Sequence, residues 1–341
     1  MKIGFFGILP KDEAYLKAQI QEELKEHEVK VFNQGVNPTS YPKEGDETDF
    51  DIISTFVASD LSKEEIAKFP NLKFIATQST GYDHIDLEFA KKHDIQVSNV
   101  PEYGSHTVAE FTFALMLGLA RKLPSAYEQI RETGSFNPEK LRGVDLFAKT
   151  LGVIGTGKIG QNVIRIARGL EMKVLAYDVA QDESFAATQG FKYCSLDELF
   201  SQADIITLHV PCLESTTHMI DAKALEKMKP TTMIINTSRG PIIDTEALLK
   251  ALQDKKLAGA ALDVLEEESA ARDEANFLIR GDFEGHDLKD IIANHILIDM
   301  ENVLVTPHIA YNTDEATHRI LDTTIKNIQS FIADEPINIV N

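Results

Sequence analysis

Cysteine and tryptophan are scarce in this 341-residue sequence, which contains two cysteines, Cys194 and Cys212, and no tryptophan. Two cysteines do not indicate a disulfide framework, and the sequence has neither a C-x-x-C redox motif nor a cysteine-based zinc site. We therefore expect two small buried thiols in a reducing compartment. Metal-binding spacings such as H-E-x-x-H are also missing, and we expect no metal.

Long apolar runs are absent as well. The longest is Phe111–Ala120, whereas a helix needs about 20 apolar residues to span a bilayer. The first residues, MKIGFFGILPKDEAY, lack the charged region, the long apolar region and the cleavage site of a signal peptide. The sequence therefore predicts a cytoplasmic protein without a membrane span.

Positive charge is outnumbered, because 34 lysines and arginines face 54 aspartates and glutamates, giving a formal net charge of −20. Such a field repels nucleic acids and anionic membranes, which we exclude as general partners. A small anionic substrate would need a cation placed locally against this field.

Short β-rich runs alternate with helical patterns, which predicts parallel sheets covered by helices. The length favours two domains. The first expected strands are Lys2–Gly7, Val29–Phe32, Ile52–Phe56, Phe74–Thr77 and Gln96–Ser98. A second series comprises Thr150–Ile154, Lys173–Tyr177, Ile205–His209, Met233–Asn236, Ala258–Leu262 and Val303–Thr306.

Three further segments complete the expected organisation. The helix Ser105–Lys122 is apolar nearly all round, so we expect it to be buried between domains or subunits. The helix Thr313–Ile332 cannot form a domain alone and is expected to pack back on the first domain. Between Asp263 and Val303 the chain is acidic and less regular, which indicates an elaborated loop with some helix.

The segment LGVIGTGKIG carries the pattern G-x-G-x-x-G at Gly155, Gly157 and Gly160. The first glycine permits a tight turn, the second lets the backbone approach a pyrophosphate, and the third lets a helix pack closely on the strand. An apolar strand precedes the pattern and an amphipathic helix follows it. A pyrophosphate would bind at the helix start, near Lys158 and Ile159.

Asp178 ends the next strand, about 20 residues after the first glycine. A carboxylate at this position can accept hydrogen bonds from the ribose hydroxyls of the adenosine and repels a 2′-phosphate. The next two residues, Val179 and Ala180, bring no cation. The sequence therefore predicts NAD rather than NADP as the cofactor.

These patterns together predict an α/β protein with two doubly wound parallel-sheet domains. We expect an NAD-binding Rossmann domain at residues 102–308. It would be inserted into a discontinuous, flavodoxin-like substrate domain made of residues 1–101 and 309–341.

Polar groups recur where strands of the second series end, and ligands of open α/β sheets bind outside the carboxyl ends of the strands. The residues at these strand ends are His209, Thr237, Ser238, Arg239, Asp263 and His308, together with the prolines Pro211 and Pro307. Each could singly be a loop residue. Together they include a cation, a carboxylate and imidazoles, which favours a site of chemistry.

Several motifs resemble the D-isomer-specific 2-hydroxyacid dehydrogenases, in the order in which that family has them. They are G-Y-D-H-I-D at 81–86, N-V-P-E-Y-G at 99–104, H-V-P at 209–211, N-T-S-R-G-P at 236–241, G-A-A-L-D-V-L-E-E-E at 259–268 and T-P-H-I-A-Y at 306–311. The resemblance covers about residues 70–320, and the first 70 residues match in type only.

This resemblance implies a catalytic set of Arg239, Glu268 and His308. Carbonyl reduction needs a proton donor at the oxygen, and an imidazole can exchange a proton near neutral pH, so His308 would be that acid. A neighbouring carboxylate would hold the imidazole. The family spacing selects Glu268 over Glu266 and Glu267. Arg239 can bind a carboxylate with its forked donors and polarise the carbonyl.

The resemblance also implies binding residues. The implied cofactor contacts, beyond the glycine motif and Asp178, are Val210, Pro211, Thr216, Thr237, Ser238 and Asp263, the last toward the nicotinamide carboxamide. The implied substrate contacts are Thr80, Gly81, Tyr103 and Tyr311. His209 is expected to be structural or a cofactor-side contact, whereas His84, His106 and His218 are expected to be non-catalytic.

Tyr103 and Tyr311 bear on the substrate, because aromatic side chains narrow a pocket and suit a methyl or short alkyl group. The D-lactate dehydrogenase branch has aromatics at both places, which favours pyruvate and D-lactate. Gly104 and Ser105 replace that branch's usual Ser-Pro. Reduction of hydroxypyruvate, glyoxylate or a branched 2-oxo acid stays open, as does an NADH-sensing role like that of related corepressors.

The resemblance further implies a homodimer. The helix Ser105–Lys122 and the segment Glu128–Phe147, which resembles the dimer arm of the family, would form its interface.

Overall fold

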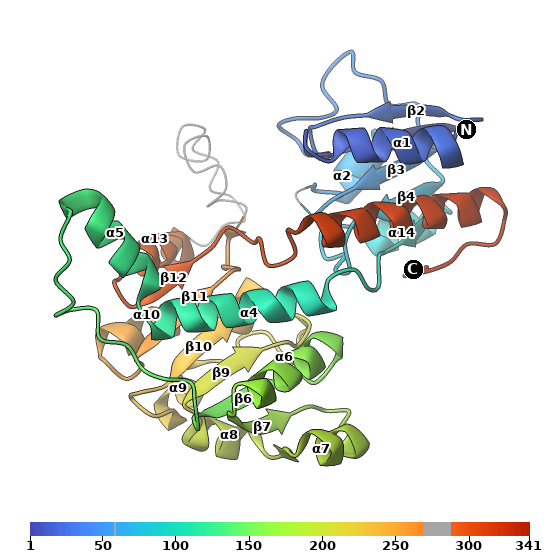
Figure 1. The fold of residues 1–341 in the computed structure, drawn as a ribbon. Helices are drawn as coiled ribbons and strands as arrows, with labels where there is room; N and C mark the ends of the chain where they lie inside the picture. The colour runs from blue at the N-terminus through green and yellow to red at the C-terminus, as the bar shows by residue number, and fades with distance from the viewer. Residues whose placement is uncertain (58, 269–287) are drawn as a thin grey trace. The chain divides into compact units, whose positions relative to one another are not determined.

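The computed structural model describes residues 1–57, 59–268 and 288–341. The chain forms two compact units: Met1–Gly104 joined by Asn312–Asn341, called here the terminal unit, and Ser105–Tyr311, called the central unit. Figure 1 follows the chain through both. The predicted boundaries, after residues 101 and 308, lie a few residues before these.

The terminal unit is built on a five-stranded parallel sheet with the strand order β2-β1-β3-β4-β5. Its strands are β1 (Lys2–Phe5), β2 (Glu28–Val31), β3 (Ile52–Thr55), β4 (Phe74–Thr77) and β5 (Gln96–Ser98). This is a doubly wound, flavodoxin-like order. The strand predicted to reach Gly7 ends at Phe5, and Gly7 has φ +75°, outside the extended region.

Helices cover this sheet and build its core. They are α1 (Glu13–Glu23), α2 (Lys63–Ile66), α3 (Leu87–Lys92) and α14 (Asp314–Ile332). The C-terminal helix α14 packs against α1 and β4, and its Leu321 and Ile325 are buried with Phe5 and Phe74. The helix predicted over Thr313–Ile332 therefore contributes to the core of the unit formed by the N-terminal residues.

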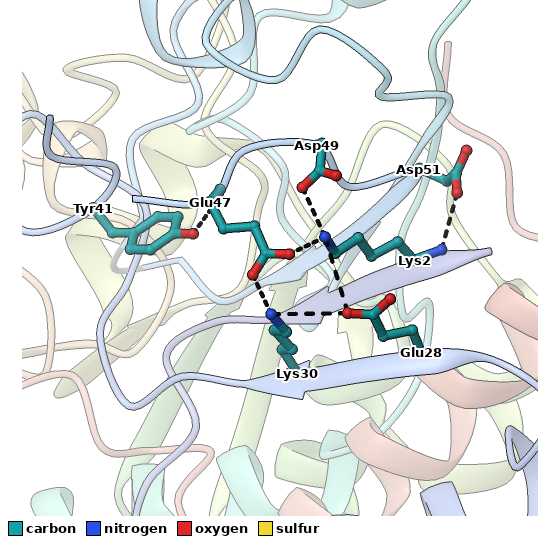
Figure 2. A network of polar contacts seen from close by, with 7 residues as sticks. All are labelled: Lys2, Glu28, Lys30, Tyr41, Glu47, Asp49 and Asp51. Atoms are coloured by element: carbon teal, nitrogen blue, oxygen red, sulfur yellow. Dashed lines mark hydrogen bonds and ion pairs between the residues drawn. The ribbon is translucent and has the colours of Figure 1, made fainter. Parts of the chain in front are cut away.

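A network of charged side chains lies at the beginning of β1 and β2 (Figure 2). The Lys2 ammonium donates to Asp49 at 2.8 Å and lies 3.9 Å from Glu28. Both Lys2 and Lys30 also pair with Glu47. The network fastens the loop before β3 to the strands. It lies at the amino ends of the parallel strands, opposite the edge where such sheets bind ligands, so we assign it a structural role.

The central unit contains a seven-stranded parallel sheet with the order β12-β11-β10-β9-β6-β7-β8. Its strands are β6 (Thr150–Ile154), β7 (Lys173–Tyr177), β8 (Lys192–Tyr193), β9 (Ile205–Leu208), β10 (Met233–Asn236), β11 (Gly259–Leu262) and β12 (Val303–Val305). Six were predicted. The two-residue β8 was not, because it is too short for a hydrophobic pattern. This order is that of a dinucleotide-binding Rossmann domain with one added strand.

The helices of this unit are α4 (Ser105–Ala120), α5 (Leu123–Thr133), α6 (Lys158–Gly169), α7 (Glu183–Gln189), α8 (Leu196–Gln202), α9 (Ala222–Lys227), α10 (Thr245–Gln253) and α13 (Leu288–Ile298). Helix α5 contacts α4 and buries none of its own residues. Helices α4 and α6 pack together on one face of the sheet, and α8, α9 and α10 share a core on the other (Figure 1). The predicted α/β class with two doubly wound parallel sheets is confirmed.

Within one chain, helix α4 buries most of its apolar side chains but leaves Leu117 42% exposed, so its burial on that side stays a prediction about the subunit interface. Cys194 and Cys212 are free but partly exposed rather than buried. The acidic stretch contains the helix α13, whereas residues 269–287 lie outside the described residues. No helix in the described part of the chain is long and apolar enough to cross a membrane.

Candidate active site

The three glycines after β6 meet different surroundings. A Cβ on Gly155, which has φ +93°, would lie 2.5 Å from the carbonyl oxygen of His209, and one on Gly160 would lie 2.0 Å from that of Gly155. Close packing within the protein therefore requires both. A Cβ on Gly157 would meet nothing within 4 Å. The second glycine thus faces open space into which a ligand can approach the backbone.

This open position caps a helix. Gly157 is the N-cap of α6, which begins at Lys158. The amides at a helix start and the helix dipole favour an anionic group. Ile159 packs against the core and anchors the turn. The residues present therefore fit a pyrophosphate.

Asp178 lies directly against the glycine turn. Its carboxylate accepts hydrogen bonds from the backbone N–H of Thr156 at 2.6 Å, the Thr156 hydroxyl at 3.0 Å and the N–H of Ala180 at 2.8 Å. Burial raises the pKa of Asp178, but the hydrogen bonds from Ala180 and Thr156 outweigh it and hold the pKa below its ordinary value. An anionic acceptor here fits ribose hydroxyls and repels a 2′-phosphate.

The loops after β9 and β10 are tied to each other. The Ser238 hydroxyl donates to the carbonyl of Val210, and the Thr216 hydroxyl donates to that of Pro211 at 2.6 Å. Between them, Thr237 shares a hydrogen bond of 3.0 Å with Thr112 of α4. The structure thus brings these predicted cofactor contacts to one edge of the sheet.

His209 belongs to the same edge but not to the acid–base chemistry. Burial lowers the pKa of His209 to about 3, so the ring is neutral at physiological pH. Its Nε2 lies 2.9 Å from the hydroxyl of Thr207. This arrangement is structural.

Arg239 lies in a turn held by Asn236, the last residue of β10. The buried Asn236 amide donates to the carbonyl of Arg239 at 2.9 Å and accepts from the N–H of Ser238 at 3.0 Å. The guanidinium Nη1 donates to the carbonyl of Ser238 at 2.8 Å. Asn236 was not among the predicted site residues.

Asp263 organises the loop that carries His308. Its side chain, 1% exposed, accepts hydrogen bonds from the Thr306 hydroxyl at 2.5 Å and from the N–H groups of Ile309 at 3.0 Å and Ala310 at 2.8 Å. Its carbonyl accepts from the N–H of His308 at 2.9 Å. Burial raises the pKa of Asp263, although these hydrogen bonds act to lower it. The sequence predicted Asp263 as a nicotinamide contact and gave no indication that it holds the His308 loop.

His308 pairs with Glu268. The imidazole Nδ1 lies 3.0 and 3.1 Å from the two carboxylate oxygens, and both side chains are partly buried. Among the described residues, Nε2 has no hydrogen-bond partner. The carboxylate therefore orients the ring, and Nε2 is the nitrogen left to exchange a proton with another molecule.

The other two glutamates of the tract differ from Glu268. The Glu266 carboxylate bonds to His218 at 2.7 Å and to the hydroxyl of Thr245 at 2.6 Å. Glu267 has a left-handed backbone with φ +51°. Glu268 is thus the glutamate whose carboxylate meets His308.

The predicted substrate contacts fall in both units. Tyr311 lies in the central unit, with its ring centroid 6.5 Å from that of His308 and at an interplanar angle of 80°. In the terminal unit, the Thr80 hydroxyl donates to the carbonyl of Val100 at 2.7 Å. The Tyr103 carbonyl accepts from Arg319 at 2.5 Å.

The turn after β4 keeps backbone donors available. The Gly81 carbonyl accepts from the Ser79 hydroxyl at 2.6 Å, and the Thr80 carbonyl accepts from Asn99 at 2.8 Å. Among the described residues, the N–H groups of Thr80 and Gly81 donate to no acceptor. Two such donors can bind a carboxylate.

In residues 1–57, 59–268 and 288–341, no three histidine, cysteine, aspartate or glutamate side chains gather closely enough to hold a metal ion.

A Rossmann sheet, an open glycine turn and an imidazole–carboxylate pair define a dinucleotide-dependent oxidoreductase. Comparison with known families is more specific. Residues 113–310 match the model described as "D-isomer specific 2-hydroxyacid dehydrogenase, NAD binding domain". The chain belongs to the D-isomer-specific 2-hydroxyacid dehydrogenase family and is an NAD-dependent enzyme, as the sequence predicted.

Three relatives illustrate the range of the family. An aromatic 2-oxoacid reductase of Clostridium sporogenes is 38% identical over 83% of each chain. A D-lactate dehydrogenase of Curvularia clavata is 35% identical over 98% of this chain and 94% of its own. The crystal structure of D-lactate dehydrogenase from Aquifex aeolicus complexed with NAD and lactic acid has a TM-score of 0.84 and 35% identity, covering 99% of this chain and 98% of its own. These relatives share activity on 2-oxo or 2-hydroxy acids, whereas the particular substrates in their names differ.

Proposed function

We propose that this enzyme interconverts pyruvate and D-lactate. The observation that carries the proposal is the Tyr311 ring standing edge-on to His308, with centroids 6.5 Å apart. An aromatic wall beside the proton donor favours a small apolar substituent on the 2-carbon. Similarity over nearly the whole chain to D-lactate dehydrogenases supports the same substrate.

Each catalytic residue has a distinct proposed role. His308 donates a proton from Nε2 to the carbonyl oxygen in reduction and accepts it in oxidation. Glu268 holds the ring and stabilises its protonated form. Arg239 binds the substrate carboxylate and polarises the carbonyl. Bound NADH supplies the hydride.

The binding residues complete this assignment. We propose that the amides of Thr80 and Gly81 bind the substrate carboxylate and that Tyr103 and Tyr311 shape the substrate pocket. Cofactor binding is assigned to the glycine turn and Asp178, together with a set of strand-end residues. That set is Lys158, Ile159, Val210, Pro211, Thr216, Thr237, Ser238 and Asp263. We also propose that residues 102–308 form the cofactor-binding domain. Residues 1–101 together with 309–341 would form the substrate domain.

One assay tests the substrate. NADH oxidation is followed with pyruvate, hydroxypyruvate, glyoxylate and phenylpyruvate, and kcat/KM is compared. We expect pyruvate to be preferred and the product to be D-lactate. A higher kcat/KM for phenylpyruvate would instead favour an aromatic 2-oxo acid, a second candidate supported by the 38% identity to the clostridial reductase. Preference for hydroxypyruvate or glyoxylate would also overturn the pyruvate assignment.

We also propose a homodimer formed through the central unit. Large apolar side chains are exposed along α5 and the segment after it: Leu123, Tyr127, Ile130, Phe136, Val144 and Phe147. Burying such a surface stabilises association. Sedimentation at micromolar concentration should show a dimer, and a monomer alone would contradict the proposal.

A cytoplasmic location is our last proposal, because both cysteines are free thiols and such thiols persist in reducing compartments. Cell fractionation tests it, and recovery with secreted proteins would contradict it.

A further inference from the structure

A second histidine–carboxylate pair lies beside the catalytic loops, formed by His218 and Glu266. The imidazole Nε2 and a carboxylate oxygen are 2.7 Å apart. The other carboxylate oxygen accepts from the N–H of Thr245 at 3.0 Å and from its hydroxyl at 2.6 Å. Glu266 is 8% exposed. Three hydrogen bonds therefore hold a nearly buried carboxylate that the proposed chemistry does not use.

This pair touches both loops that carry catalytic residues. The backbone N–H of His218 donates to the carbonyl of Pro241 at 2.8 Å, in the turn after Arg239. Its side chain meets Glu266, which stands two residues before Glu268. His218 thus links the two loops through one residue.

The backbones of these two loops are also in direct contact. A Cβ on Gly240 would lie 2.1 Å from the carbonyl carbon of Leu265 and 2.4 Å from the nitrogen of Glu266. Only a glycine permits this approach. Because the backbones are in contact, a shift of residues 265–266 displaces the turn that holds Arg239 as well as the loop that ends in Glu268.

The electrostatics favour a strong pair. The hydrogen bond to Glu266 raises the pKa of His218, although burial acts to lower it. The negative charges of Asp244 and Asp290 raise this pKa further. A protonated imidazole donating to a carboxylate forms a charge-assisted hydrogen bond, which is stronger than a neutral one.

We propose that His218 and Glu266 are positioning residues that lock the Glu268 loop onto the Arg239 turn. They act on the reaction through Arg239 and Glu268 and touch neither substrate nor cofactor. The inference rests on the proposed function, which assigns Arg239, Glu268 and His308 to the chemistry.

The test compares two substitutions at one position. His218→Leu removes the side-chain donor at similar size, and His218→Gln retains an N–H donor. We expect His218→Leu to lower kcat per NADH-binding site on the order of tenfold, since small displacements of catalytic groups slow turnover. The Kd for NADH, measured by fluorescence quenching, should stay unchanged. His218→Gln should restore most of the lost kcat.

A matched control separates positioning from general destabilisation. Lys227 and Asp197 form an ion pair of 2.6 Å in the same unit, and the Lys227 side chain is 46% exposed, as is that of His218. Lys227→Met should leave kcat unchanged. Equal effects of His218→Leu and Lys227→Met on kcat per NADH-binding site would overturn the proposal, as would failure of His218→Gln to rescue.

A further arm distinguishes this inference from the proposed function. If His308→Gln keeps near-normal turnover, the proposed function is wrong. If His308→Gln is inactive while His218→Leu behaves as the Lys227→Met control does, only the positioning role is wrong. A His218→Leu variant combined with Glu268→Gln should lose less than the product of the two separate effects, because both act on the same loop.

Discussion

The two carboxylate oxygens of Glu268 are almost equidistant from Nδ1 of His308, at 3.0 and 3.1 Å. The ring is thereby held at one nitrogen while the other stays available. Residues 263–267 separate Glu268 from β11, and residues 306–307 separate His308 from β12, the neighbouring strand of the sheet. Neighbouring parallel strands thus deliver the acid–base residue and its carboxylate to the same edge.

Glu268→Gln tests this relationship. The amide keeps a hydrogen-bonding group at Nδ1 but removes the charge that makes the hydrogen bond to the ring a strong one. We expect kcat for pyruvate reduction to fall on the order of tenfold, because the ring is held less firmly. Glu267→Gln is the matched control and should leave kcat unchanged. A fall in kcat with Glu267→Gln but none with Glu268→Gln would show that the wrong glutamate was chosen.

His308→Gln should lower kcat by about a thousandfold, because it removes the proton donor at the carbonyl oxygen. NADH binding should be nearly normal, since the donor acts only as the carbonyl is reduced. Steady-state kinetics and fluorescence titration with NADH measure the two effects. Near-wild-type turnover would reject the mechanism.

Arg239→Lys keeps the charge and loses the forked donors. An ammonium cannot reproduce the two-point contact with a carboxylate. We therefore expect a fall in kcat on the order of a hundredfold, together with a higher KM for pyruvate. Kinetics over a wide range of pyruvate concentrations separate the two parameters. An unchanged KM would argue against a contact between Arg239 and the substrate carboxylate.

Much of the fold could be predicted because parallel strands are short apolar runs with clear boundaries. Six of the seven strands of the central sheet were found in this way. The last one, Lys192–Tyr193, has only two residues and no periodicity to detect. The partner of an apolar surface was harder to predict, because the composition of α4 does not show which of its side chains, such as the 42% exposed Leu117, find no cover within one chain.

The candidate site was predictable where residue type and chemistry coincide, as for His308 and Arg239. Residues that hold other residues in place could not be predicted. Asn236 and His218 act through hydrogen bonds to backbone and side chains that come close only after folding. No local sequence pattern encodes such a contact. The requirement for Gly240 also depends on a loop 25 residues away in the chain.

NAD should be preferred over NADP by at least about tenfold in kcat/KM. The reason is the anionic Asp178, whose pKa is held low by hydrogen bonds from Ala180 and Thr156 despite burial. Kinetics with NADH and NADPH at saturating pyruvate measure the ratio. Asp178→Ala should reduce the preference, and Asp182→Ala, the N-cap of α7, is a control that should retain it. Equal use of both cofactors by the wild type would contradict this prediction.

The His218–Glu266 pair should also make thermal stability depend on pH. The pKa of His218 in the folded protein is raised, first by the hydrogen bond to Glu266 and further by Asp244 and Asp290. A raised pKa in the folded state adds stability that is fully present below the unfolded value, about 6.5, and is lost as the pH rises through the folded value. The melting temperature of the wild type should therefore exceed that of His218→Leu most at pH 6. The difference should shrink toward pH 9, and it should stay small throughout because the histidine side chain is 46% exposed. Scanning calorimetry of both proteins between these pH values measures it. A difference that is constant or grows with pH would show that His218 stabilises the loop by packing rather than by its charge.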